Sequence, residues 1–366
     1  FFAVGPLLAD DFHDVASVYL ALDLREEVQV TPASTWSVSV SGNVSPEQIA
    51  GVPTGEDNLV VKAAKHVATL AGVDAQAVAF EIDKHVPVAG GMGGGSADAA
   101  AALVAIDALW CTGVESRLSN SVELGADVPF ALTGGIAIGL GRGEVLTQID
   151  SVPELNLVLV SSDEGLSTPA VYKRLDELRA ARGIDPREAS DAKVPVELVQ
   201  ALQSGNKAEI AALLKNDLQE AALDLRPDLK QTIDDGIEAG ALTGFVSGSG
   251  PTIAFLVADA NDAEELAQKL HARGYNALAA SGPARGASAR HSTCGSEPWG
   301  QQDQHGPRRR FRPRAGGLRP ACRLCHGECL FAQHRKAARV ARPGSPVGLA
   351  PRRHGNPRAI GPPDPD

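Results

Sequence analysis

The 366-residue sequence is poor in aromatic side chains, in methionine and in long apolar runs. Aromatic residues make up 4% of the chain, and Met92 is the only methionine. No stretch of 18 consecutive apolar residues occurs, so no transmembrane helix is expected. The first residues carry no basic flank, which argues against a secretory signal peptide. We therefore expect a cytoplasmic protein without a membrane partner.

Cysteine is also scarce, with five in the whole chain. Cys111 and Cys294 suggest no disulfide framework, which fits a reducing compartment. Cys322, Cys325 and His326 spell the pattern of a c-type haem attachment site or of half a zinc site. Haem attachment requires export, and a second zinc pair at proper spacing is missing. The sequence therefore predicts no metal site.

Basic residues are few over most of the chain, and the net charge of −11 argues against a nucleic-acid partner. The charge is divided unevenly, because residues 285–366 carry 16 Lys and Arg against 5 Asp and Glu. Residues 284–366 are rich in Arg, Pro and Gly and have no hydrophobic period, which predicts a disordered tail. Out-of-frame translation would give such a composition. Before the tail, we expect one domain over 1–150 and a second over 151–283.

Glycine is concentrated in one place, the stretch Pro87–Ala97, which reads PVAGGMGGGSA. An apolar segment rich in helix formers follows, so we predict a helix over 97–110 with Ser96 as its N-cap. A glycine loop that leads into a helix N-terminus presents free N–H donors and the positive end of the helix dipole. The stretch therefore predicts a phosphate-binding loop.

Three familiar glycine motifs do not fit this loop. A Walker loop requires Lys before Ser or Thr, and here Gly95 precedes Ser96. In the dinucleotide fingerprint a third glycine would replace Ser96. The protein-kinase loop is followed by a VAIK strand, which is absent. A flexible linker is the remaining alternative, but a linker would not normally lead into an apolar helix.

The hydrophobic pattern predicts a mixed α and β protein. Residues 15–24 are compatible with a strand or a buried helix, and residues 136–149 predict a hairpin. Further strands are predicted over 25–30, 36–42, 78–91 and 156–162, and on both sides of the glycine turn in 244–259. Helices are predicted from Asn58 and over 168–183, 194–205, 206–223 and 260–275.

Asp127 is the best catalytic candidate, since it lies in the glycine–proline turn GADVPF. A carboxylate in such a turn can accept a proton from a substrate hydroxyl as a general base. Asp is also a common turn residue, so Asp127 alone is compatible with a purely structural role. Together with a phosphate loop, it points to phosphoryl transfer.

These motifs resemble those of the GHMP small-molecule kinase family. The matching segments are 11–24, 57–64, 82–100, 124–130 and 247–255, in the family's order and spread over residues 3–283. The resemblance implies two domains with a cleft between them, an N-terminal ribosomal-protein-S5-like domain and a C-terminal ferredoxin-like α/β domain. The FHD and GADVPF segments are most similar to the branch that phosphorylates the 2-hydroxyl of a cytidine diphosphate methylerythritol.

The resemblance also implies ATP with Mg²⁺, a small-molecule substrate, and a monomer or homodimer. By position, Asp127 matches the catalytic aspartate, and Asn58 and Lys84 match positions near the adenosine. Phe12 and His13 match an aromatic–histidine pair that contacts the cytosine. Ser247–Pro251 matches a glycine turn that packs beside the phosphate loop. The ATP loop itself corresponds to Pro87, Val88, Ala89, Gly90, Gly91, Met92, Gly93, Gly94, Gly95, Ser96 and Ala97.

One element of the family pattern has no counterpart in this sequence. The family carries a Lys-x-Asn motif in an N-terminal strand, and here no lysine precedes Lys62. That lysine holds the catalytic aspartate ionised, so we expect weak or no activity for this chain. Two alternatives remain open, another GHMP kinase of the homoserine or mevalonate type and a non-catalytic nucleotide-binding remnant.

Overall fold

The computed structural model describes residues 1–88, 90–114, 121–162 and 164–289. The chain divides into two compact units, Phe1–Cys294 and Gly295–Asp366. All described residues belong to the first unit. The sequence patterns of the tail, including Cys322, Cys325 and His326, lie outside the described residues.

The first sheet contains four antiparallel strands in the order β1-β2-β6-β7. The hairpin predicted over 136–149 is confirmed, and residues 15–24 contribute a strand rather than a helix. Asn216 forms an isolated parallel β-bridge with Phe2, so a segment from the second half of the chain lies against β1. The strands are β1 (Phe2–Leu7), β2 (His13–Leu20), β6 (Ile136–Gly141) and β7 (Val145–Gln148).

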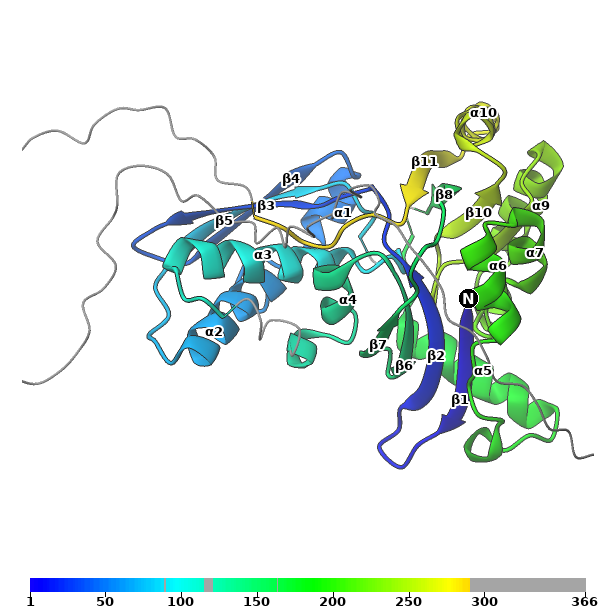
Figure 1. Cartoon of the computed structure of the whole chain (residues 1–366), viewed down its shortest axis with the longest axis horizontal. Coiled ribbons are helices and arrows are strands. Elements are labelled where there is room, and N and C mark those ends of the chain that lie inside the picture. Colours follow the sequence, from blue (N-terminus) through cyan, green and yellow to red (C-terminus); the bar gives the residue numbers. More distant parts are fainter. Residues whose placement is uncertain (89, 115–120, 163, 290–366) are drawn as a thin grey trace, which may run out of the picture. The chain divides into compact units, whose positions relative to one another are not determined.

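The second sheet has three strands in the order β3-β5-β4, with β5 in the centre. Alternate residues of β5 are buried, because one face of the sheet packs on α2 and α3 (Figure 1). The strands are β3 (Glu27–Pro32), β4 (Ser37–Gly42) and β5 (Val78–Lys84), and the helices of this region are α1 (Pro46–Ala50), α2 (Leu59–Ala71), α3 (Gly94–Trp110) and α4 (Val128–Thr133).

The third sheet is antiparallel, with the order β11-β8-β10-β9. The chain passes through it as strand, helices, two strands, helix and strand, which is the ferredoxin-like arrangement expected from the sequence. The strands are β8 (Leu155–Ser161), β9 (Thr243–Val246), β10 (Ile253–Val257) and β11 (Asn276–Gly282), and the helices α9 (Asp228–Ala239) and α10 (Ala260–Ala272) pack on one face.

One predicted helix is wrong, because residues 206–223 form two helices instead of one. The chain leaves the helical path at Leu214, and Asn216 accepts a hydrogen bond from Leu218 N through its own side chain. Side-chain bonds of this kind compete with the helix ladder. The remaining helical elements are α5 (Thr168–Ala181), the 3₁₀ turn η2 (Pro186–Glu188), α6 (Val196–Ser204), α7 (Lys207–Leu213) and α8 (Gln219–Leu225).

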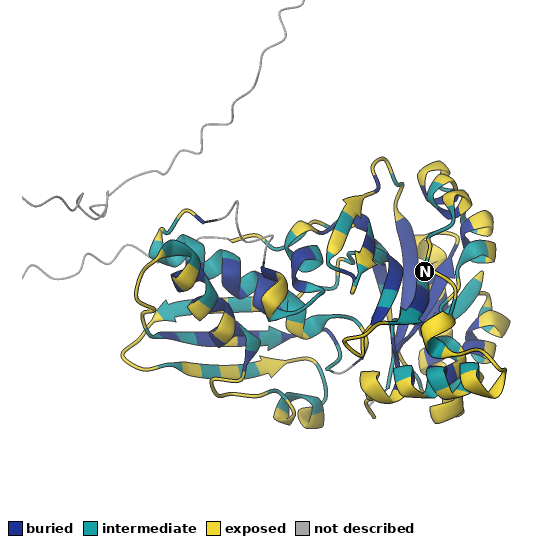
Figure 2. Cartoon of the chain, turned by 90° about the horizontal axis from the view of Figure 1, so that it is seen from below, coloured by how far each residue is buried: buried dark blue, intermediate teal, exposed yellow. Residues whose placement is uncertain are grey.

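Three hydrophobic clusters stabilise these layers, and the buried residues lie mainly on the strands and on the inner faces of the helices (Figure 2). One cluster joins Ala16 and Ile136 of the first sheet to Leu157 of the third and to Leu198 of α6. The domain boundary predicted near residue 150 falls between β7 and β8, and this cluster crosses it. The division at 150 therefore stays a prediction.

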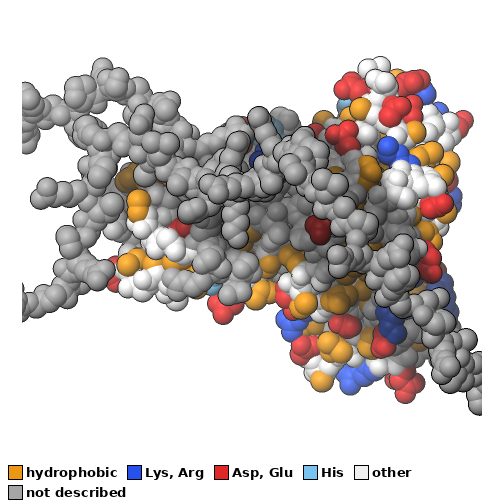
Figure 3. Space-filling view, in the orientation of Figure 1, with side chains coloured by type: hydrophobic (Ala, Val, Ile, Leu, Met, Phe, Trp, Pro, Cys, Tyr) orange, Lys and Arg blue, Asp and Glu red, His pale blue; other side chains and the backbone are white. Residues whose placement is uncertain are grey.

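The described surface carries charges of both signs, interspersed with apolar side chains (Figure 3). On α9, Lys230 pairs with Asp234, and Arg273 reaches Asp235 from beyond α10. Within the described ranges, no helix combines the length and the hydropathy needed to cross a membrane.

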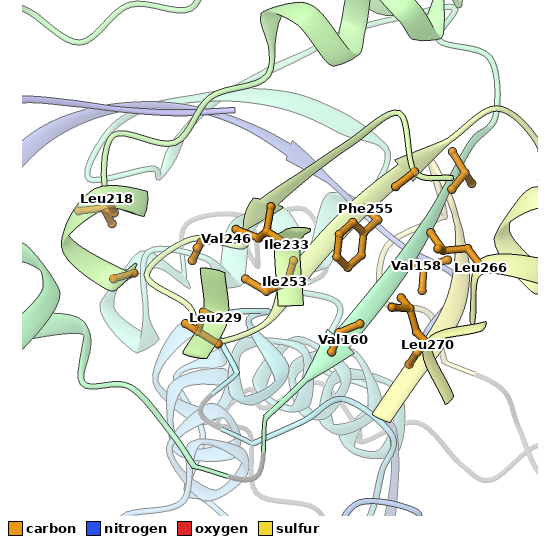
Figure 4. Packing of buried hydrophobic residues seen from close by; sticks show 14 of the residues in the cluster. Val158, Val160, Leu218, Leu229, Ile233, Val246, Ile253, Phe255, Leu266 and Leu270 are labelled. Carbon is orange, nitrogen blue, oxygen red and sulfur yellow. The ribbon is translucent and has the colours of Figure 1, made fainter. Parts of the chain in front are cut away.

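The packing of α9 on β10 generates a test of the fold. The Phe255 ring is fully buried among Val158, Ile233 and Ile253 (Figure 4), and it lies against Gly236. A Cβ at Gly236 would come within 2.1 Å of the ring. Although alanine favours helices by about 1 kcal/mol over glycine, Gly236→Ala is expected to lower the free energy of unfolding by about 2 kcal/mol through overpacking.

Urea denaturation measures this loss of stability. Gly55→Ala is the control, since nothing lies within 4 Å of its added Cβ. Adding Phe255→Leu to Gly236→Ala makes room and should recover part of the loss. A Gly236→Ala protein as stable as the Gly55→Ala protein would show that this packing is wrong.

Candidate active site

The glycine loop connects the end of β5 to the start of α3, as expected. The helix begins three residues earlier than predicted, at Gly94, and its N-cap is Gly93 with a φ of 67°. Ser96 is therefore not the N-cap, and no side chain caps this helix. Left-handed backbone is accessible to glycine without steric cost, so the loop can turn into the helix without a capping side chain.

The loop packs against the second glycine turn by direct backbone contact. Gly91 has a φ of 73°, and a Cβ there would lie 2.6 Å from the carbonyl oxygen of Ser247. Ser247 Oγ donates a hydrogen bond to Gly91 O over 3.1 Å, and Thr252 N donates one to Gly90 O over 3.3 Å. The turn predicted at Ser247–Pro251 therefore lies beside the loop.

The start of α3 presents main-chain donors. The earliest helical hydrogen bond at this end runs from Ala97 N to Gly93 O. The N–H groups of the residues before Ala97 precede the helix ladder, and the first turn contains no acidic residue that would neutralise the positive end of the dipole. Ser96 and Ala97 are half-buried here, and Gly95 is exposed. The loop thus fits an anionic group such as a phosphate.

Asp127 lies directly beside this loop. It is the N-cap residue of α4, and its Oδ2 lies 4.0 Å from a Cβ placed on Gly93. Both residues line the same cavity, whose volume is about 1430 Å³. Among the described residues, no Lys, Arg or His forms an ion pair with Asp127. The expectation of weak activity depends on such a missing cation, and it stays a prediction.

Burial raises the pKa of Asp127, and a hydrogen bond from the Tyr19 hydroxyl partly opposes the rise. Burial and the charge of Asp127 also raise the pKa of Tyr19. The pKa of Tyr172 rises to about 12, mainly through burial and also through Asp127. Both phenols line the same cavity as Asp127, and both keep their hydroxyl proton at neutral pH.

Tyr19 was not identified from the sequence, although a signal for it existed. Its ring stacks on Phe130, with the centroids 5.0 Å apart. Added Cβ atoms at Gly139 and Gly143 would approach the ring or its hydroxyl to 2.3 and 2.1 Å. The glycines of the hairpin thus make room for Tyr19. The sequence pattern alone explains these glycines only as turn residues.

Phe12 and His13 lie next to each other in the chain but occupy different environments. Phe12 is 52% exposed, with the Arg142 guanidinium 3.9 Å above its ring. His13 is buried as the first residue of β2. Its Nε2 lies 3.3 Å from Asp176 Oδ2, and its ring stacks on Tyr172.

The two residues expected near the adenosine are both engaged in internal contacts. Asn58 is buried and caps α2, where its Oδ1 accepts from Val60 N. Lys84 is buried at the end of β5 and pairs with Glu26 and Asp98. These contacts do not test a role toward a nucleotide, so both assignments stay predictions.

The rest of the predicted loop surrounds these contacts. Pro87 packs beside Gly90, and Val88 N donates a hydrogen bond to Gln48 over 3.3 Å. Met92 packs against the cluster that joins the first and third sheets. Ala89 lies outside the described residues.

The cavity also brings together polar residues that sequence reasoning missed. The hydroxyls of Thr168 and Ser249 lie 2.8 Å apart at its wall. Asn216 donates to the carbonyls of Val246 and Gly248, which fixes the second glycine turn. In the described part of the chain, no group of three or more His, Cys, Asp and Glu is arranged to hold a metal.

Comparisons with known proteins agree with this geometry. The family model for the GHMP kinases N terminal domain matches residues 58–135. The model for the GHMP kinases C terminal region matches residues 198–276. The first match contains the loop and Asp127.

Similar proteins cover most of the chain. Proteins named 4-diphosphocytidyl-2-C-methyl-D-erythritol kinase are 47% identical in Paenarthrobacter aurescens, over 78% of this chain and 90% of the relative, and 48% identical in Nocardia farcinica, over 78% and 91%. A crystal structure of 4-(cytidine 5'-diphospho)-2C-methyl-D-erythritol kinase is 27% identical, with a TM-score of 0.61 over 76% of this chain and 94% of that one.

A crystal structure of L. major mevalonate kinase in complex with R-mevalonate shares the fold. It is 17% identical, with a TM-score of 0.56 over 76% of this chain and 90% of that one. The similarity therefore extends over both halves of the described unit. The chain belongs to the GHMP kinase family.

Proposed function

We propose that the protein transfers the γ-phosphoryl group of ATP to the 2-hydroxyl of 4-(cytidine 5'-diphospho)-2-C-methyl-D-erythritol, in the non-mevalonate route to isoprenoid precursors. The names and the 47% identity of the relatives support this substrate. The observation that carries the mechanism is the position of Asp127, a buried carboxylate beside the N-cap glycine of α3.

The glycine loop would hold the phosphates of ATP. The main-chain N–H groups at the start of α3 supply donors, and the helix dipole favours negative charge there. The residues in the described part of the cavity do not form a metal cage. Mg²⁺ would therefore enter bound to ATP, where it neutralises phosphate charge.

Asp127 would act as the general base. As the acceptor oxygen forms its bond to the γ-phosphorus, the bond from that phosphorus to the ADP oxygen breaks, and the hydroxyl proton passes to the Asp127 carboxylate. A carboxylate whose pKa is raised by burial is a stronger base than an exposed one. The Tyr19 hydrogen bond lowers the pKa of that carboxylate and so favours its ionised form.

The cytosine end of the acceptor would lie near Phe12 and His13. The stack of His13 on Tyr172 places a flat aromatic surface from α5 beside β2. A planar base can stack on such rings. The two ring nitrogens of His13 lie 3.2 Å from Gly5 O and 3.3 Å from Asp176 Oδ2, so the imidazole would contribute its ring face rather than a hydrogen bond. A cytoplasmic location and a monomeric or homodimeric state remain predictions.

Binding and transfer assays together test the proposal. ATP with Mg²⁺ and cytidine diphosphate should each bind, and radiolabelled phosphate should pass slowly to the cytidyl substrate. Transfer to homoserine or mevalonate, with no competition from cytidine nucleotides, would favour another GHMP kinase. ATP binding without any transfer would favour the nucleotide-binding remnant. If ATP does not bind, the proposal is wrong.

Replacement of the base tests its role. Asp127→Asn keeps the shape of the side chain but removes the proton acceptor, so phosphoryl transfer should fall by about 100-fold or more. The ATP dissociation constant should change little, because main-chain amides hold the phosphates. Asp185→Asn, an exposed N-cap on η2, is the control and should transfer at the parent rate. Undiminished transfer by Asp127→Asn would contradict the assignment.

The pH dependence tests the role of Tyr19. Its hydrogen bond lowers the pKa of Asp127, so Tyr19→Phe should raise that pKa. Since only the ionised carboxylate accepts a proton, the acid limb of the kcat/KM profile should move to higher pH. Tyr275→Phe removes a hydroxyl that bonds Asp235 on α9, and it should leave the limb in place. A shift to lower pH in Tyr19→Phe would be inconsistent with this role.

Two glycines of the loop should respond differently to alanine. Gly91 has a positive φ, and an added Cβ there would lie 2.6 Å from a carbonyl oxygen. Gly91→Ala should therefore lower the free energy of unfolding by about 2 kcal/mol and weaken ATP binding. Gly95 lies in α3 with its nearest neighbour at 3.6 Å, so Gly95→Ala should gain up to about 1 kcal/mol. Thermal unfolding with and without ATP measures the stability and the ATP binding of each variant. Equal changes in Gly91→Ala and Gly95→Ala would contradict the loop geometry.

A further inference from the structure

Three charged side chains lie buried directly behind the glycine loop. Lys84 Nζ is 2.6 Å from Glu26 Oε1 and 2.9 Å from Asp98 Oδ2. The three side chains are between 1 and 6% exposed. We call Lys84, Glu26 and Asp98 the buried triad.

The buried triad connects the two ends of the loop. Lys84 is the last residue of β5, where the loop begins, and Asp98 lies in the first turns of α3, where the loop has ended. Glu26 precedes β3 and makes two further contacts: its Oε2 accepts a hydrogen bond from His85 N over 2.9 Å, and its Oε1 lies 3.1 Å from the Cβ position of Gly94. Each end of the loop is thus held to the same ammonium group.

Stability alone does not explain the buried triad. Two carboxylates share one ammonium, so the group carries excess negative charge in a site without solvent. Burial raises the pKa of Asp98 to about 6, although Lys84 acts in the opposite direction, and the charge of Glu26 adds to the rise. Buried ion pairs are often no more stable than apolar side chains of the same volume. A role in fixing one specific conformation accounts better for their presence.

We propose that Lys84, Glu26 and Asp98 are positioning residues that hold the glycine loop in its anion-binding conformation before the nucleotide arrives. This inference rests on the proposed function, in which the loop binds the phosphates of ATP. A loop held in advance loses less conformational freedom on binding, so its amides contribute more to affinity. The triad acts through the loop and touches neither phosphate nor acceptor.

Asp98→Asn tests this inference, because the amide keeps the side-chain shape but weakens the bond to Lys84. Hydrogen exchange of the protein without ligand should accelerate by about tenfold in peptides that cover 84–101 and stay unchanged in β10. The dissociation constant of ATP should rise by about tenfold, and that of cytidine diphosphate should stay close to the parent value.

The matched control is Asp235→Asn, which removes a partly buried carboxylate that bonds Tyr275, Gln231 and Arg273 far from the loop. It should leave exchange in 84–101 and both dissociation constants unchanged. If exchange in Asp98→Asn is unchanged, or rises equally in β10, the triad only stabilises the fold and the inference is wrong. Should Asp98→Asn fail to fold, Glu26→Gln undergoes the same comparison with the same two outcomes.

The proposed function and the positioning role of the triad can be refuted separately. If the parent protein does not bind ATP, the proposed function is wrong. The exchange comparison requires no ligand and still decides whether the triad orders the loop. If the parent binds ATP and Asp98→Asn binds it equally well, the proposed function stands and the positioning role is overturned.

Discussion

The site depends on close contact between two glycine turns, at a point where Gly91 carries no side chain. Gly91 of the loop approaches the carbonyls of Ser247 and Gly250 within distances that a Cβ would not allow. This contact brings the end of β5, the start of α3 and the turn before β10 to one place. Beside this contact, the amides at the start of α3 precede the helix ladder, which begins with the bond from Ala97 N to Gly93 O.

The chemistry follows from where the buried charge lies. Asp127 and the triad are both taken out of water, but their surroundings differ. The triad contains its own cation, whereas Asp127 shares its cavity with the phenols of Tyr19 and Tyr172. Burial, opposed in part by the Tyr19 hydroxyl, therefore sets the direction of the Asp127 pKa shift, and no ion pair within the described residues contributes. A buried carboxylate without a paired cation can accept a proton, while the carboxylates of the triad are engaged by Lys84.

The sequence predicted most elements, since these depend on local patterns, and it singled out the glycine loop and Asp127, which the structure places side by side. The glycine run, the apolar stretch after it and the GADVPF turn each have a signature, and the structure brings the loop and Asp127 together. The start of α3 and the break at Asn216 were mispredicted, because backbone packing and side-chain bonds from distant segments decide them. The burial of His13 depends on α5, which lies far away in the sequence.

The central claim is that phosphates bind to the amides at the start of α3 beside Asp127. A ¹H–¹⁵N spectrum of protein labelled at its 38 glycines, recorded with and without ATP and Mg²⁺, tests it most directly. The account predicts that the largest shifts belong to Gly93, Gly94 and Gly95, with the resonances of Gly236 in α9 and of Gly274 just after α10 unchanged. Large shifts elsewhere, with these three resonances unmoved, would contradict it.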